Sequence, residues 1–211
     1  MTLFSDEALD HLRQNDPLLG KAIDRFGKIE METNCDPFAA LIRNIAGQQI
    51  SGKAAETVWN RLNTACHPMD AVTIHKTDLS TIQSCGMSLR KAEYIRDIAN
   101  NVISGALNLD RIRTLPDEEA IKELTVCRGV GVWTAEMLLI VSYQRPDIVS
   151  WNDFGIRRGM MRLYEQDTLS KEQFQIYRGR YAPYGTIASF YLWAVARDGE
   201  HFPKRKNLSV N

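Results

Sequence analysis

Hydrophobic residues recur every three or four positions along most of the chain and almost nowhere alternate with polar residues. This spacing is typical of helices with one buried face, whereas a half-buried strand shows a period of two. The sequence therefore predicts an all-α fold. It contains no internal repeat and no linker rich in Pro or Ser, which favours one helical unit over residues 1–200, compact or with two lobes.

Several helix starts are marked by capping residues. Asp16-Pro17 and Asp36-Pro37 each place a carboxylate at the N-cap before a proline in the first helical position. Apolar stripes follow both pairs, and Gly27 and Gly47 are predicted to end these two helices. Further starts are predicted at Ser51, at Ser88, at Ser170 in a capping box with Gln173, and at Pro183, where an apolar helix continues to Arg197.

Composition limits the classes of protein that fit. The 211 residues are 44% hydrophobic, which is ample for a packed core. The 26 basic and 26 acidic side chains cancel, and this argues against binding nucleic acid by bulk electrostatics alone. No apolar run of about 18 residues and no signal-peptide pattern is present, so we expect no membrane partner and a cytoplasmic (nucleoid-associated) or nuclear location rather than secretion. Residues 201–211 are expected to form a polar basic tail.

Cysteine and histidine residues are scattered along the chain. The four cysteines and four histidines show no close spacing of the kind that metal ions or iron–sulfur clusters require. We therefore expect buried, reduced thiols, no catalytic metal and no cofactor.

Two glycines, Gly129 and Gly131, separate a short helix after Pro116 from a second helix at Val132–Val141. Glycine permits a positive φ and removes the Cβ atom that would keep a ligand from the backbone. The amides at the start of the second helix can then face an anion such as a DNA phosphate. An ordinary tight turn between two helices is the alternative interpretation.

Asp153 follows an irregular segment and stands where a new helix begins. An aspartate in this position is commonly an N-cap, and this is the structural alternative to a chemical role. Motifs elsewhere in the chain help to decide between an N-cap role and a chemical role for Asp153.

The chain resembles the helix-hairpin-helix (HhH-GPD) DNA glycosylase superfamily, in its alkylation-repair branch of the 3-methyladenine DNA glycosylase II type, from about residue 16 to 199. The motifs that carry the resemblance are Ile-Ala-Gly-Gln-Gln-Ile-Ser at 45–51, Gly-Met-Ser-Leu-Arg-Lys-Ala-Glu-Tyr-Ile at 86–95, Gly-Val-Gly-Val-Trp-Thr-Ala-Glu-Met at 129–137, Asn-Asp-Phe-Gly-Ile-Arg-Arg-Gly at 152–159 and Ala-Pro-Tyr-Gly-Thr-Ile-Ala-Ser-Phe-Tyr-Leu-Trp at 182–193. The resemblance implies a bilobed fold with the active-site cleft between the lobes. The central lobe would span about 38–142, and the terminal helices would form the second lobe.

The resemblance also implies roles in binding double-stranded DNA. Gly129, Gly131 and Thr134 match the hairpin that holds a phosphate near the lesion. The loop that fills the gap left by a flipped nucleotide matches Gln48 and Gln49, with Ser51 beside it; for Gln49, a plain polar corner residue is the alternative. Hairpin carbonyls of this kind can bind a monovalent cation, and the matching residues here are Thr125, Cys127 and Val130.

Asp153 matches the essential aspartate of the family, at the mouth of the base pocket. Trp133 and Trp193 match pocket walls, with Met137 and Tyr191 beside them; core packing is the alternative for each tryptophan. Bifunctional members have a lysine at the position of Trp133, and a tryptophan cannot form their Schiff base. The resemblance therefore implies a monofunctional glycosylase that leaves an abasic site without cutting the strand.

The absence of a general acid predicts which bases the enzyme can release. Near these motifs no His, Glu or Lys has an evident role in protonating a neutral leaving base. N3- or N7-alkylated purines leave readily because they carry a positive charge, and each contact of that charge with an aromatic side chain contributes about 0.5–2 kcal/mol. The alternatives are a glycosylase for oxidised or deaminated bases and a non-catalytic module that binds DNA or another protein. No obligate protein partner is evident.

Overall fold

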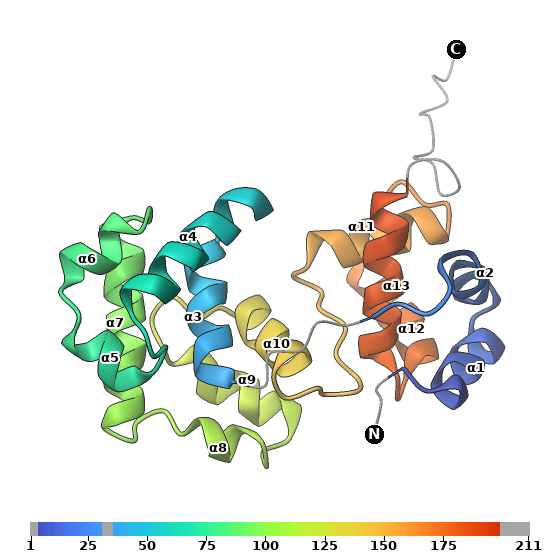
Figure 1. Ribbon diagram of the computed structural model, residues 1–211. Helices are drawn as coiled ribbons and strands as arrows, with labels where there is room; N and C mark the ends of the chain where they lie inside the picture. Colours follow the sequence, from blue (N-terminus) through green and yellow to red (C-terminus); the bar gives the residue numbers. More distant parts are fainter. Residues whose placement is uncertain (1–3, 31–35, 199–211) are drawn as a thin grey trace. The chain divides into compact units, whose positions relative to one another are not determined.

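The computed structural model describes residues 4–30 and 36–198, and every regular element in these ranges is a helix (Figure 1), which confirms the predicted all-α fold. No helix of the described part is long and apolar enough to span a membrane. The predicted tail at 201–211 lies outside these ranges. The helices are α1 (Asp6–Asn15), α2 (Pro17–Phe26), α3 (Pro37–Gly47), α4 (Gly52–Ala65), α5 (Ala71–Lys76), α6 (Leu79–Ser84), α7 (Leu89–Ile103), α8 (Leu109–Ile112), α9 (Asp117–Thr125), α10 (Val132–Val141), α11 (Phe154–Leu163), α12 (Lys171–Tyr181) and α13 (Gly185–Arg197).

The chain divides into two compact units. The terminal unit joins Met1–Glu32 to Gln144–Asn211, and the central unit is Thr33–Tyr143. Helices α1, α2, α11, α12 and α13 belong to the terminal unit, and α3 to α10 belong to the central unit. The terminal unit therefore depends on contacts between the two ends of the sequence.

The predicted caps form. Asp16 and Asp36 each accept hydrogen bonds from two first-turn amides, and Ser170 with Gln173 forms a reciprocal capping box. Ser51 and Ser88 cap α4 and α7. These side chains supply acceptors for amides that no helical carbonyl can reach, so they determine where each helix begins.

The last helix starts later than its sequence predicts. Helix α13 begins at Gly185 rather than Pro183. The Gly185 amide donates to Asp147 Oδ1 at 3.0 Å, and the next amide, of Thr186, donates to the Pro146 carbonyl at 2.9 Å. A carboxylate 38 residues away thus takes the place of a local cap, which inspection of the residues before α13 could not reveal.

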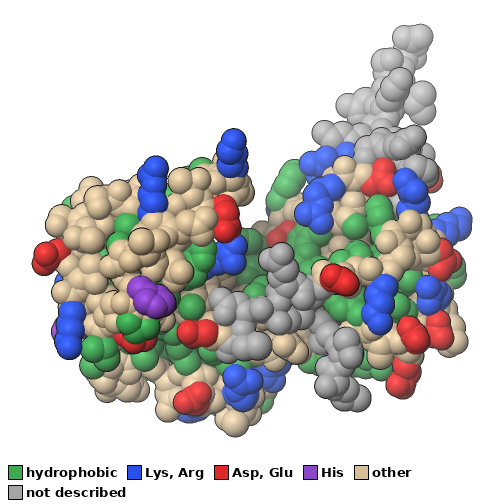
Figure 2. Space-filling view, in the orientation of Figure 1, with side chains coloured by type: hydrophobic (Ala, Val, Ile, Leu, Met, Phe, Trp, Pro, Cys, Tyr) green, Lys and Arg blue, Asp and Glu red, His purple; other side chains and the backbone are tan. Residues whose placement is uncertain are grey.

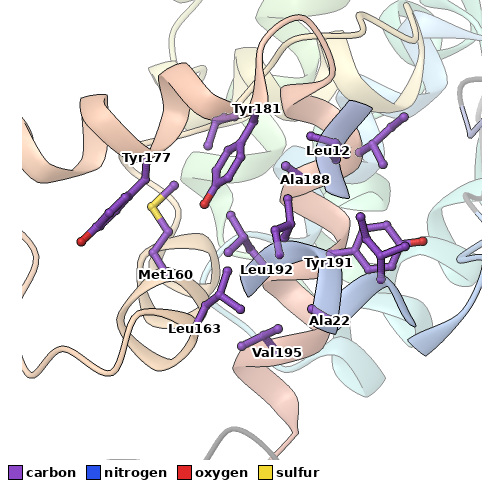
Figure 3. Packing of buried hydrophobic residues seen from close by; sticks show 14 of the residues in the cluster. Leu12, Ala22, Met160, Leu163, Tyr177, Tyr181, Ala188, Tyr191, Leu192 and Val195 are labelled. Atoms are coloured by element: carbon purple, nitrogen blue, oxygen red, sulfur yellow. The ribbon is translucent and has the colours of Figure 1, made fainter. Parts of the chain in front are cut away.

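Helix α13 is the centre of the terminal unit and contacts α2, α11 and α12 (Figure 1). Its apolar side chains meet those of α1, α2, α11 and α12 in one hydrophobic core, part of which is shown in Figure 3. Helix α11 approaches so closely that a Cβ atom on Gly159 would lie 2.1 Å from the Leu192 carbonyl oxygen. Only glycine fits there, and its absent side chain sets the spacing of the two helices.

The central unit is built around α3 and α7. Helix α7 contacts α3, α5 and α6, while α3 also contacts α4 and α10. Leu41, Ile42 and Ile45 are fully buried on α3, as are Ile95 and Ala99 on α7. The predicted apolar stripes of these helices therefore form core contacts.

A buried polar network joins the ends of the chain in the terminal unit. Asp16 is 1% exposed, and its Oδ2 accepts hydrogen bonds from Tyr164 at 2.5 Å and from Arg180 at 3.3 Å. The Tyr164 and Tyr181 hydroxyls are 2.7 Å apart. Burial, with Tyr181 and Asp16 beside it, raises the pKa of Tyr164. The tyrosine therefore keeps its proton and donates a hydrogen bond to the carboxylate.

We expect Asp16→Ala to lower the free energy of unfolding by about 2–4 kcal/mol, because it removes an N-cap and the buried carboxylate that accepts from Tyr164 and Arg180. Urea denaturation followed by circular dichroism measures this. The control is Asp10→Ala, whose exposed carboxylate pairs with Arg13 at 2.9 Å and should change stability by less than about 1 kcal/mol. Equal effects of the two variants would contradict a stabilising role for the buried network.

Candidate functional site

Asp153 is the N-cap of α11 and is 7% exposed. Its Oδ1 accepts hydrogen bonds from the Ile156 amide at 2.8 Å and from Trp193 Nε1 at 3.0 Å. Asp153 is therefore a helix N-cap, the structural role that the sequence left open. Both of these donors are uncharged, so these two hydrogen bonds orient the carboxylate without forming an ion pair with it.

Trp193 connects Asp153 to the central helix of the terminal unit. Its ring is half-buried and meets Phe190 edge to face, with centroids 5.1 Å apart. A Cβ atom on Gly155 would lie 2.8 Å from Trp193 Cδ1 and 3.0 Å from Asp153 Oδ1. Glycine at 155 thus leaves room for the indole to reach the carboxylate. The core-packing interpretation of Trp193 is therefore confirmed, and its N–H binds the acid, while its place in the wall of a base pocket stays a prediction.

Two buried hydroxyls hold the segment that leads to Asp153. Thr186 Oγ1 donates to the Arg145 carbonyl at 2.5 Å and accepts from the Ile148 amide at 3.0 Å. Ser189 Oγ donates to the Ile148 carbonyl at 2.9 Å. Both side chains are fully buried in α13. Both residues belong to the motif at 182–193. Their role could not be predicted from that motif, because their hydrogen-bond partners lie about forty residues earlier in the sequence.

Two cationic side chains lie over the ring of Trp151, which comes two residues before Asp153. The guanidinium of Arg157 is 5.2 Å from the Trp151 ring centroid, and the ammonium of Lys171 is 5.9 Å from it. Phe154, directly after the acid, is 65% exposed. Elsewhere basic and acidic side chains are interspersed over the face of both units shown in Figure 2. Attraction to a polyanion would therefore come from local groups such as these.

Tyr191 is not at a pocket wall. It is fully buried in the terminal core (Figure 3). Its hydroxyl donates to the Gly27 carbonyl at 2.8 Å. Burial raises the pKa of this tyrosine. The motif placed Tyr191 two residues from Trp193, but a two-residue step turns a side chain by about 200° around a helix, to the opposite face.

The hairpin between α9 and α10 uses its two glycines differently. Gly129 has φ +86°, and a Cβ atom on it would lie 2.3 Å from Tyr94 Cδ2. Gly131 has φ −90°, and no atom lies within 4 Å of where its Cβ would be. Gly129 therefore uses the positive φ that glycine permits, whereas Gly131 does not and contributes only its missing Cβ atom. The open space at Gly131 lets a ligand approach the backbone.

Helix α10 begins at this open space. Gly131 is its N-cap, so no side chain satisfies the first-turn amides. The amides and the positive end of the helix dipole suit an anion. Trp133 is 37% exposed in this first turn, whereas Thr134 and Met137 are buried. Trp133 is thus the aromatic residue of α10 that a ligand can reach, and Met137 offers little surface.

The two glutamines between α3 and α4 face different surroundings. Gln48 Nε2 donates to the Gly129 carbonyl at 3.0 Å and to Thr134 Oγ1 at 3.2 Å. Gln49 is exposed and has φ +58°. Ser51, predicted to contact DNA, accepts from the Ala54 amide at 3.4 Å as the N-cap of α4. Residues 48–51 form the corner between α3 and α4. Gln48 connects this corner to the hairpin, and the side chain of Gln49 is exposed.

Lys91, in the first turn of α7, holds the same corner. Its Nζ donates to the Ala46 carbonyl at 3.1 Å and also to the Gln48 carbonyl. Burial lowers the pKa of this lysine. Sequence reasoning did not single out Lys91 or Tyr94, although both belong to the motif at 86–95.

Metal ligands do not converge in the described part of the chain, where no group of three His, Cys, Asp or Glu side chains could hold an ion. Cys66, Cys85 and Cys127 are buried, and burial raises the pKa of each thiol. The Cys127 carbonyl accepts from the Val130 amide at 3.1 Å, which uses one of its two lone pairs. The cation site at Thr125, Cys127 and Val130 stays a prediction.

Comparison with known proteins identifies the family. Residues 42–180 match the model of the HhH-GPD superfamily of base excision DNA repair proteins. The chain belongs to the HhH-GPD superfamily. DNA-3-methyladenine glycosylase 1 of Schizosaccharomyces pombe is 31% identical over 194 residues, which cover 90% of this chain and 85% of that protein.

Solved structures of HhH-GPD proteins share the fold. A DNA-3-methyladenine glycosidase from Bacillus halodurans is 30% identical with a TM-score of 0.81, and the match covers 93% of this chain and 92% of that one. A 3-methyladenine DNA glycosylase from Schizosaccharomyces pombe, in complex with abasic DNA, is 30% identical with a TM-score of 0.80, covering 89% and 95%. The hairpin and Asp153 described above thus belong to an HhH-GPD fold.

We expect Gly129→Ala and Gly131→Ala to differ in stability. Gly129→Ala combines an unfavourable φ with a clash against Tyr94 and should lower the free energy of unfolding by about 2 kcal/mol or more. Gly131→Ala meets no atom and should cost less than about 1 kcal/mol. Urea denaturation of both variants measures the difference, and a less stable Gly131→Ala than Gly129→Ala would contradict this account of the hairpin.

Proposed function

We propose that this HhH-GPD chain is a base-excision DNA glycosylase that flips an alkylated purine out of duplex DNA and hydrolyses its N-glycosidic bond. The observation that carries the proposal is the carboxylate of Asp153, buried at the start of α11 and oriented by Trp193. The names of its relatives, which are DNA-3-methyladenine glycosylases, support the same substrate class.

Binding begins at the hairpin. The amides at the start of α10 hold a DNA phosphate near the lesion, and the open space at Gly131 lets that phosphate approach. Flipping costs a few kcal/mol, least for a damaged base that pairs poorly. Gln49, exposed at the corner before α4, is suited to enter the vacancy and bond to the orphaned partner base.

Cleavage breaks the bond between C1′ and the purine nitrogen, and its electron pair neutralises the cationic alkylated ring. The sugar becomes oxocarbenium-like, and the Asp153 carboxylate stabilises that positive charge. Water then adds to C1′ and releases a proton. No step requires an acid to protonate the leaving base, which suits substrates that already carry a positive charge.

Trp133 supports this substrate class. It is exposed in the first turn of α10, where its π face can attract a cationic base. Its indole cannot form a Schiff base with the sugar. Lys91 does not supply that amine, because its Nζ is bonded to the Ala46 and Gln48 carbonyls. The product is therefore an abasic site in an intact strand.

We expect Asp153→Asn to slow base release by about 100-fold or more. Asparagine retains the oxygen that accepts from Ile156 and Trp193, and it caps helices as well as aspartate does, so the variant removes mainly the charge. The measurement is free-base release from duplexes containing 7-methylguanine, 3-methyladenine, hypoxanthine or 8-oxoguanine.

Asp167→Asn, at an exposed position, is the matched control and should release bases at the normal rate. Tight duplex binding without release of any base by the unmodified protein would favour a non-catalytic module. Release of only 8-oxoguanine or hypoxanthine would assign an oxidised or deaminated substrate. Equal rates for Asp153→Asn and the unmodified protein would remove Asp153 from the mechanism.

We expect the reaction to leave an uncut strand. Denaturing electrophoresis of the duplex product should show cleavage only after hot alkali is added, and borohydride should trap no covalent complex, because no amine lies at position 133. Strand cutting without alkali, or a trapped complex, would show a lyase activity that this site does not provide for.

A further inference from the structure

The motif at 86–95 has no role in the chemistry proposed so far. Its residues contact both the corner at 48–51 and the hairpin at Gly129, the two proposed DNA-binding elements of the central unit. Lys91 and Tyr94 are three residues apart on α7 and therefore share one face of that helix. Lys91 contacts the corner before α4, and Tyr94 packs against the hairpin at Gly129. One helical turn thus supports two loops that are about eighty residues apart in sequence.

The contact with the corner is electrostatic as well as geometric. Ala46 lies in the last turn of α3, and Gln48 is the residue that caps it. Their carbonyls lie at the negative end of the helix dipole, where an ammonium group is favourable. The Lys91 ammonium binds both carbonyls and so fixes the backbone directly before Gln49.

The contact with the hairpin is completed by Gln48. Its side-chain amide donates to the Gly129 carbonyl and to Thr134 Oγ1, on the two sides of the start of α10. Its backbone carbonyl is held by Lys91. Lys91, Gln48 and Gly129 therefore form a continuous chain of hydrogen bonds from α7 through the corner to the hairpin.

We propose that Lys91 is a positioning residue, which fixes the Gln49 corner relative to the phosphate-binding hairpin so that Gln49 can enter the vacancy left by the flipped nucleotide. The inference rests on the glycosylase function proposed above. Lys91 touches neither the leaving base nor the sugar in this mechanism, and its effect should appear in flipping rather than in bond cleavage. A purely structural lysine would affect both alike.

The test compares Lys91→Met with the unmodified protein on two duplexes under single-turnover conditions, one with 7-methylguanine opposite cytosine and one with it opposite an abasic analogue. The second duplex has no partner base to orphan, so flipping is easier and Gln49 has no base to replace. We expect Lys91→Met to slow release from the paired duplex about tenfold or more, and from the abasic-opposed duplex by less than about threefold. 2-Aminopurine beside the lesion should show less unstacking with the variant.

Lys91→Arg should restore much of the rate, because a guanidinium also donates to two carbonyls. Lys76→Met, at an exposed position in the last turn of α5, removes the same charge and should change neither rate. Gln48→Met breaks the link to the hairpin alone and should repeat the selective loss. It also keeps the test decisive if Lys91→Met does not fold.

Equal slowing on both duplexes, by either variant, would overturn the proposal, as would rates equal to those of the unmodified protein. These outcomes are distinct from failure of the proposed function. In that case the unmodified protein would release 7-methylguanine from neither duplex.

Discussion

The hydrogen bond from the Trp193 indole to the Asp153 carboxylate requires α11 and α13 to lie almost in backbone contact. Two glycines of α11 make that approach possible, since any side chain at 155 would meet the indole and any at 159 would meet the Leu192 carbonyl. The rest of the terminal unit supports the same contact. The core packs around α13, and the buried hydroxyls of Thr186 and Ser189 hold the segment that delivers Asp153 to the start of α11.

Asp153 has a structural role as an N-cap and, in the proposed function, a chemical role as well. A carboxylate at a helix N-cap is oriented by backbone amides that cannot move independently, so its position costs little reorganisation during a reaction. Trp193 adds a second uncharged donor. An enzyme that stabilises a positive sugar needs a firmly held carboxylate, and the hydrogen bonds from the Ile156 amide and the Trp193 indole hold Asp153 in this way.

In the proposed function, the central unit binds nucleic acid through backbone amides rather than through net charge. The chain has no net formal charge, and the proposed anion site is the start of α10, which has no side-chain cap and follows a glycine with open space around it. Such a site depends on precise placement of amides. Gln48 bonds to residues on both sides of the start of α10, and Lys91 holds the backbone carbonyl of Gln48. The binding and flipping proposed above would then depend on the rigidity of this one unit.

Most helices could be predicted from the residues alone, because apolar periodicity and local caps act within a few residues: Asp16, Asp36, Ser170 and Asp153 all begin helices where their neighbours predicted. The motifs also identified the family and the position of the hairpin. Features that depend on distant contacts became visible only in the folded chain. Asp147 caps α13 and shifts its start, Tyr191 turns into the core, and Lys91 holds a corner more than forty residues away. The physical reason is that capping and periodicity are local properties, whereas the partner of a buried polar group is chosen by the packing of whole helices.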